Sequence, residues 1–223
     1  MTYARLLTLV LAAALGAACR TASGPTTPQT TATAPQILQP GAPGESTRPV
    51  TANQASDLSK VQATEADVKF MQGMIGHHAQ ALEMVELLKT RTANEGMKKL
   101  ALRIEVSQED EIKMMQEWLQ RRGQPLPDPH AHHKGGMLMP GMLTADEMAR
   151  LAAAKGVEFD RLFLEGMIKH HGGALTMVQE LFASPGAGQE SDIFAFASDV
   201  DADQRMEIER MGAMLNALNK EQQ

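Results

Sequence analysis

The chain has 223 residues and a formal net charge of −6, and its 27 acidic residues outnumber the 21 basic ones, so no nucleic-acid partner is predicted. Aromatic residues make up only 4% of the chain, whereas there are 16 methionines, a composition that suits a helical core. The single cysteine excludes a disulfide bond within the chain.

Residues 1–19 have the pattern of an export signal. Arg5 precedes an apolar run, residues 6–15, that is too short to span a bilayer permanently. The small residues after it end at Cys19 in a pattern similar to a bacterial lipobox, although Leu15 stands one place early. We predict an exported protein, periplasmic or at the cell surface, that is held at a membrane if Cys19 is lipidated. An ordinary cleaved signal is the alternative.

Residues 20–60 form a stretch of different composition. They are rich in Thr, Ala, Pro and Gln and have almost no large apolar side chains. Such a segment cannot bury enough surface to offset the entropy cost of ordering. We predict a disordered tether here, followed by one folded domain over residues 61–223.

The folded domain is predicted to consist of helices. Thr64 and Asp67 resemble a capping box that opens the first helix, and Gly123 with Pro125 ends the second. A loop rich in Pro and Gly, residues 125–142, precedes a short helix capped by Thr144. The helices are expected at about residues 64–90, 97–121, 145–156, 158–182 and 191–218.

One stretch of the chain occurs twice. Residues 70–85 recur 93 positions later as residues 163–178, and each copy carries a His-His pair within apolar rows of helical spacing. These histidines therefore face inward, where an imidazole needs hydrogen bonds or a metal. In each half, the next long helix carries Gln and Glu three residues apart on its inner stripe. Two such hairpins predict an all-α, antiparallel four-helix bundle.

The polar positions of the four helices should lie at one height and form a candidate metal centre. Imidazole and thioether ligands together favour copper, and thioethers select the cuprous ion, Cu(I). Glutamate is expected to serve as a ligand, or as an acceptor that fixes a histidine tautomer. The candidate ligands of the bundle are Met74, His77, His78, Met84, Glu111, Met167, His170, His171, Met177 and Glu207.

The loop at residues 125–142 is a second candidate metal-binding segment. It is a short His/Met tract of the kind that captures soft metal ions. The alternative is a solvated connection in which the histidines are incidental, and packing is the alternative for each methionine. The candidate ligands of the loop are His130, His132, His133, Met137, Met139 and Met142.

These segments resemble a known family. Residues 70–85 and 163–178, the tract at 136–144 and the run from Gln108 to Met115 are similar to the domain-of-unknown-function family 305, over about residues 66–218. The resemblance implies a ferritin-like helical bundle and, from some relatives, periplasmic copper binding through methionine and histidine. It points to the same Met and His positions in both copies. Glu83 fits an acidic position of the family pattern, whereas Thr176 departs from it.

We therefore predict a copper-binding protein that buffers, sequesters or transfers the metal and is not an enzyme, with a delivery partner that the sequence does not identify. Two alternatives remain open. A ferritin-like di-metal oxidase would need Glu from two helices and Glu-x-x-His from the other two, and the layer lacks Glu-x-x-His. In a metal-free scaffold, the histidines and glutamates would simply bond to one another.

Overall fold

The computed structural model describes residues 36–39, 47–56, 61–130 and 138–221, which fall into two compact units, 1–56 and 57–223. In the first unit, β1 (Ile37–Gln39) pairs antiparallel with β2 (Arg48–Val50), and a single helical turn follows, α1 (Ala52–Ala55). These short elements lie within the range predicted as a disordered tether, residues 20–60, and that assignment stays a prediction. Cys19 lies outside the described residues.

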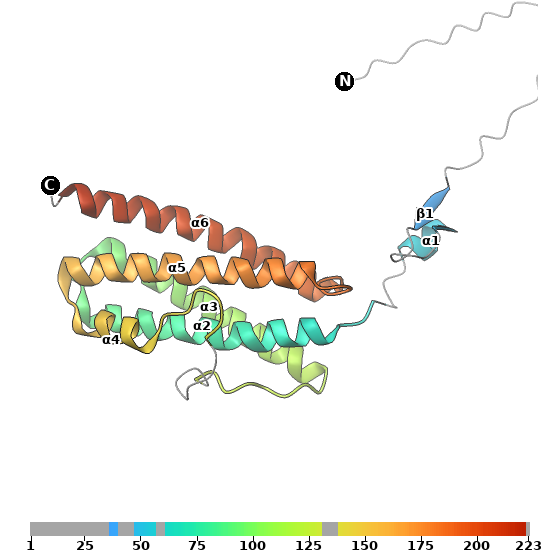
Figure 1. Ribbon diagram of the computed structural model, residues 1–223, viewed down its shortest axis with the longest axis horizontal. Coiled ribbons are helices and arrows are strands. Elements are labelled where there is room, and N and C mark those ends of the chain that lie inside the picture. Colours follow the sequence, from blue (N-terminus) through green and yellow to red (C-terminus); the bar gives the residue numbers. More distant parts are fainter. Residues whose placement is uncertain (1–35, 40–46, 57–60, 131–137, 222–223) are drawn as a thin grey trace, which may run out of the picture. The chain divides into compact units, whose positions relative to one another are not determined.

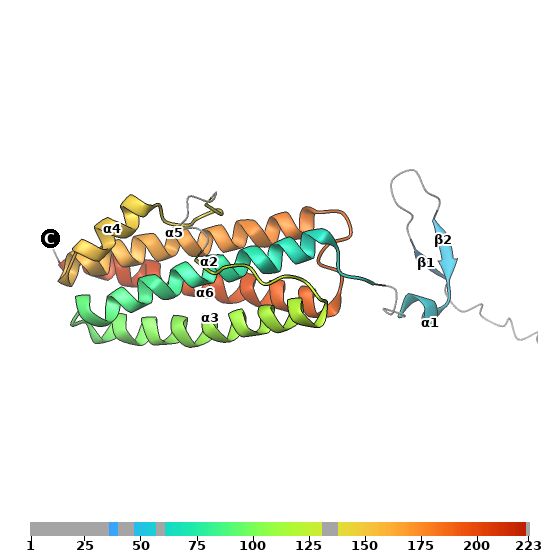
Figure 2. The same cartoon turned by 90° about the horizontal axis from the view of Figure 1, so that it is seen from below.

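In its described residues, the second unit, the helical unit, contains four long helices and one short helix (Figures 1 and 2). The long helices lie lengthwise beside one another, with α2 packed along α3 and α5 along α6. The predicted all-α class is thus confirmed. No helix among the described residues is both long and apolar enough to cross a membrane. The helices are α2 (Glu65–Arg91), α3 (Glu95–Arg121), α4 (Ala145–Ala153), α5 (Gly156–Ala183) and α6 (Ser191–Glu221).

The starts of these helices follow from local side-chain chemistry. Thr64 and Asp67 form the predicted capping box of α2, in which each side chain accepts a hydrogen bond from the other's backbone N–H. Thr144 and Glu147 cap α4 in the same way. Helix α4 ends at Ala153 rather than near Gly156, which instead begins α5 with a left-handed φ of +59°.

The core of the helical unit is divided into two apolar clusters. We name them after Phe163 and Trp118, and each takes residues from α2, α3, α5 and α6. On α2 the Trp118 cluster ends at Ile75 and the Phe163 cluster begins at Ala81. Between the clusters α2 carries the buried polar side chains of His77, His78 and Gln80, so a polar layer crosses the middle of the core.

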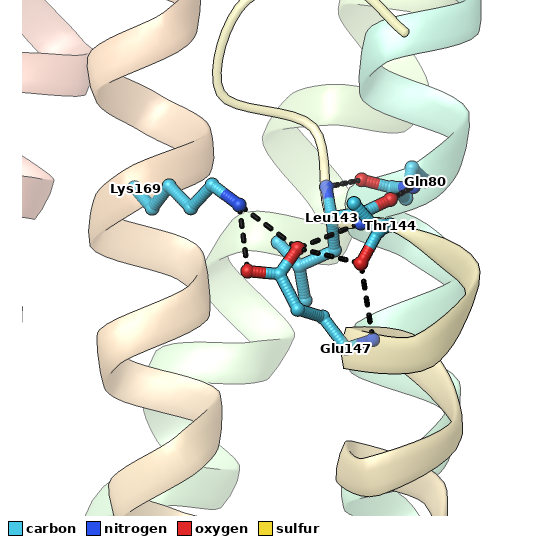
Figure 3. A network of polar contacts seen from close by, with 5 residues as sticks. All are labelled: Gln80, Leu143, Thr144, Glu147 and Lys169. Atoms are coloured by element: carbon cyan, nitrogen blue, oxygen red, sulfur yellow. Dashed lines mark hydrogen bonds and ion pairs between the residues drawn. The ribbon is translucent and has the colours of Figure 1, made fainter.

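A short strap, residues 139–143, runs between α2 and α5 ahead of α4. At Gly173 on α5, an added Cβ atom would lie 1.9 Å from the carbonyl oxygen of Pro140, so only glycine permits this approach. Gly141 touches the same segment of α5 and has a left-handed φ of +74°. Figure 3 shows Gln80 of α2 beside the strap, where its amide accepts from Leu143 N at 2.7 Å and donates to Leu143 O at 2.9 Å. Backbone contact on one side and a double hydrogen bond on the other thus fix the strap.

Candidate metal centre

The polar layer forms at mid-height, as the repeated pattern predicts. The four histidines on α2 and α5 are at most 1% exposed. Gln108 and Gln204 are buried with them, whereas Glu111 is only partly buried. The layer consists of His77, His78, Gln108, Glu111, His170, His171, Gln204 and Glu207.

Two of the histidines donate to backbone carbonyl groups. His77 Nε2 lies 3.0 Å from the carbonyl oxygen of Pro140 in the strap, and His170 Nε2 lies 2.9 Å from that of His77. A carbonyl oxygen can only accept, so both Nε2 atoms carry a hydrogen. In these neutral rings, Nδ1 is therefore the atom with the free lone pair.

The other two histidines are held by carboxylates. His78 Nε2 lies 2.5 Å from Glu111 Oε2, and His171 Nε2 lies 2.7 Å from Glu207 Oε2. The second oxygen of Glu111 accepts from Ser107 Oγ at 3.1 Å. The two glutamates, predicted as ligands or as acceptors for histidine, occupy the acceptor role in this arrangement.

Each of the four imidazoles has one ring nitrogen without a hydrogen-bond partner. The Nδ1 atoms of His77, His78, His170 and His171 are buried and have no hydrogen-bond partner among the described residues. A buried polar atom without a partner costs free energy, so such atoms usually mark a missing ligand or water. Histidines that bind metal typically donate their other N–H to a carboxylate or carbonyl group. The layer has this pattern at every histidine.

His77 and His170 are in direct contact across α2 and α5. Their ring centroids lie 3.8 Å apart, with the ring planes inclined at 37°. Burial, together with the neighbouring histidines, lowers the pKa of His77 to about 3 and that of His170 well below its usual value. Both rings are therefore neutral near pH 7, which is the form that binds a metal ion.

Sulfur atoms flank the layer on both sides. Met84 and Met167 belong to the Phe163 cluster, and Met74 and Met177 to the Trp118 cluster. Across the part of the chain that the structure describes, no three His, Cys, Asp or Glu side chains gather closely enough to hold a metal ion. A metal in this layer would therefore combine imidazole with thioether donors, which suits a soft ion such as Cu(I).

The amide side chains of the layer are also incompletely bonded. Both side-chain polar atoms of Gln108 and the Oε1 atom of Gln204 are buried without a partner within the described ranges. These groups are free to contact an ion or a water molecule that enters the layer.

The described residues of the predicted His/Met loop lie in different environments. Met142 is only 3% exposed and Met139 is partly buried, because the strap holds them against the helices. His130 is exposed, and its Nδ1 lies 2.8 Å from Glu83 Oε1 on α2. His132, His133 and Met137 lie outside the described residues.

Two residues that position the site were missed by the sequence analysis. Gln80 clamps the strap, and Gly173 makes room for it. They occupy the same place in the two copies, because Gly173 lies 93 positions after Gln80. The signal that could have found them is this mismatch within an otherwise similar repeat.

The two stacked histidines should make the stability of the metal-free protein depend on pH. Their pKa values are lowered in the folded state, so the unfolded chain binds more protons below its ordinary histidine pKa of about 6.5. The free energy of unfolding is then at its full value above about pH 6.5. Below that pH it falls by roughly 1.4 kcal/mol per pH unit for each ring. Urea unfolding between pH 7.5 and 5.0 would measure this loss, and equal midpoints across that range would contradict it.

The chain is similar to known proteins in both sequence and structure. The family model described as "Domain of unknown function (DUF305)" matches residues 67–215. A DUF305 fragment from Deinococcus radiodurans is 32% identical, with a TM-score of 0.60, and the match covers 70% of this chain and 98% of that one. A candidate secreted DUF305 protein from Streptomyces coelicolor is 30% identical, with a TM-score of 0.59 and coverage of 69% and 94%.

CopM is a further structural relative, solved in Cu(I)-bound, Cu(II)-bound and Ag-bound forms. The Cu(I) form is 28% identical to this chain, with a TM-score of 0.54 and coverage of 70% of this chain and 98% of that one. No curated protein sequence matches the chain.

Proposed function

The chain belongs to the DUF305 family, and we propose that it binds copper, with Cu(I) favoured, and buffers, sequesters or transfers it outside the cytoplasm. The observation that carries this proposal is the set of four buried Nδ1 atoms without partners, each on a ring whose Nε2 atom is already held. A metal ion bound by one or two of these Nδ1 atoms, together with flanking thioethers, would satisfy those lone pairs, and the held Nε2 atoms would fix the rings to receive it.

The donor types support copper rather than zinc or a di-iron centre. Thioethers of four buried methionines lie on both sides of the histidines, and soft donors select Cu(I). The structural likeness to CopM, which was solved with Cu(I), Cu(II) and Ag, supports the same class of metal.

We also propose that the protein works outside the cytoplasm. The export pattern at residues 1–19 and the likeness to a candidate secreted relative support this location. Lipidation of Cys19, with residues 20–60 as a tether, would then hold the helical unit near a membrane. The exposed His130, with His132 and His133, would offer a first contact for copper ions.

A binding role is favoured over an oxidase. A ferritin-like di-metal oxidase places a carboxylate-rich set of ligands inside the helices. Here Glu111 and Glu207 are each bonded to a histidine Nε2 atom, and the gathered donors are mainly imidazoles and thioethers. Oxygen consumption by the iron-loaded or manganese-loaded protein would favour the oxidase instead.

The proposal is tested by competition for Cu(I) and by thermal unfolding. The full chain is expected to withdraw Cu(I) from a coloured chelator. A ligand present at about 1,000 times its dissociation constant stabilises the native state by roughly 4 kcal/mol, so copper should raise the melting temperature by several degrees. An unchanged melting temperature and no withdrawal of Cu(I) would instead support a metal-free scaffold.

A further inference from the structure

The repeat creates two matching notches on α2 and α5. Gly73 and Gly166 stand at equivalent positions of the two copies. A Cβ atom added at Gly73 would lie 3.3 Å from Met177 Cε, and one added at Gly166 would lie 3.3 Å from Met84 Cε. Each notch thus receives the equivalent methionine of the opposite helix.

The strap fills the two notches with different side chains. Met139 Sδ would lie 3.2 Å from a Cβ atom at Gly73, and Leu143 Cδ2 would lie 3.1 Å from one at Gly166. These two strap residues stand two places to either side of Gly141. Leu143 is 4% exposed and belongs to the Phe163 cluster, so leucine suffices to pack such a notch. The methionine at the other notch therefore calls for a reason beyond packing.

The notch at Gly73 opens to the surface. Met139 and Met177 line a groove of about 370 Å³ together with the apolar wall of Phe70 and the charged side chains of Lys69 and Glu180. The sequence analysis assigned the two methionines to separate groups, one in the loop and one in the bundle. The structure brings them together over a single glycine.

We infer that the thioethers of Met139 and Met177 form a second soft-metal site, for Cu(I) or Ag(I), at the surface of the helical unit. This inference rests on the proposed copper function and adds an accessible position to it, because the histidine layer is almost fully buried. Thioethers are neutral at every ordinary pH and select soft monovalent ions. An ion bound at this site would lie on the strap whose Pro140 oxygen accepts from His77.

The site is held in place before any ion arrives. The Gly141–Gly173 contact fixes the strap on α5, and the double hydrogen bond from Gln80 fixes it on α2. Met139 therefore does not need to be ordered on binding, which lowers the entropy cost of capturing an ion.

The test is a titration of the full chain with Ag⁺, followed by NMR of ¹³C-labelled methionine methyl groups and of ¹⁵N-labelled imidazoles. Met139→Leu and Met177→Leu assign the two methyl signals and copy the natural leucine of the other notch. We expect both methyl signals to shift together in the unmodified protein. In either single variant, the remaining signal should need at least about tenfold more Ag⁺ for the same shift, since changing even an outer-shell partner of a metal ligand costs about 10–100-fold in affinity.

A second pair of variants tests the site without removing a sulfur. Gly73→Ala places a methyl group against the Met139 sulfur and the Met177 terminal methyl group and should weaken the Ag⁺ response of both methyl signals. Gly172→Ala is the matched control in α5, because an added Cβ atom there has nothing within 4 Å, and it should leave the response unchanged.

The outcomes separate this site from the proposed function. Imidazole shifts with unmoved Met139 and Met177 signals would overturn the surface site and leave the histidine layer standing. Methyl shifts that vanish in the leucine variants, with unmoved imidazoles, would support the surface site and count against the layer. If neither set of signals moves, both proposals are wrong.

Discussion

Replacing His77 and His170 together with alanine is expected to abolish tight copper binding by the full chain. The two rings are in contact, are neutral near pH 7 and present unpartnered Nδ1 atoms in the buried layer. Changing residues that only orient a metal-ligating histidine costs about 10–100-fold in affinity, so the loss of two ligands should cost more than about 100-fold. Competition with a Cu(I) chelator measures the change.

The alanine variant also removes two hydrogen bonds and leaves space in the core, so its fold needs a separate check. His77→Gln with His170→Gln is the companion variant, because a glutamine amide can still donate to the Pro140 and His77 carbonyl groups. Its helical circular dichroism should match that of the unmodified protein, while tight copper binding is still lost. His130→Ala, outside the layer, is the control that should retain it. Unaltered affinity in the glutamine variant would place the tight site elsewhere.

Gly173→Ala is expected to unseat the strap and to destabilise the helical unit by about 3 kcal/mol, at the upper end of typical overpacking costs. The new Cβ atom would overlap the Pro140 carbonyl group, and neither backbone can yield without losing the His77 or Gln80 hydrogen bonds. For a domain of this size, the melting temperature should fall by roughly 6–12 °C. Differential scanning calorimetry of the metal-free protein measures this shift.

The neighbouring glycine provides the control for this prediction. An added Cβ atom at Gly172 meets nothing within 4 Å. Gly172→Ala should therefore gain up to about 1 kcal/mol from the higher helix propensity of alanine. Equal effects of the two substitutions would show that the strap does not depend on close backbone contact with α5.

The helices and the polar layer could be predicted from sequence because their signals are local and repeated. Helical spacing placed His77 and His170 on inner stripes, and the Gln108–Glu111 and Gln204–Glu207 pairs pointed to the same height. Thr64 and Thr144 marked two helix starts through capping boxes, which need only neighbouring residues. Whether the layer binds metal stays a prediction.

The strap could not be predicted, because it depends on contacts between distant segments. From sequence alone, Gly173 only lowers the helix propensity of α5. The close approach of the Pro140 carbonyl group, which the structure shows, explains why glycine stands there. The sequence places Met142 in the His/Met loop, yet the side chain is buried where the strap packs against the helices. The pairing of Met139 with Met177 over Gly73 likewise has no local sequence signal.

The divided core makes the two helical hairpins depend on each other. Each apolar cluster takes residues from both hairpins, so neither hairpin has a core of its own. A hairpin expressed alone would leave its inner face uncovered, and a second copy of itself would be the natural cover. The present chain is then equivalent to a homodimer of hairpins fused end to end. Gln80 and Gly173 mark where the two halves differ, since one of these equivalent positions clamps the strap and the other makes room for it.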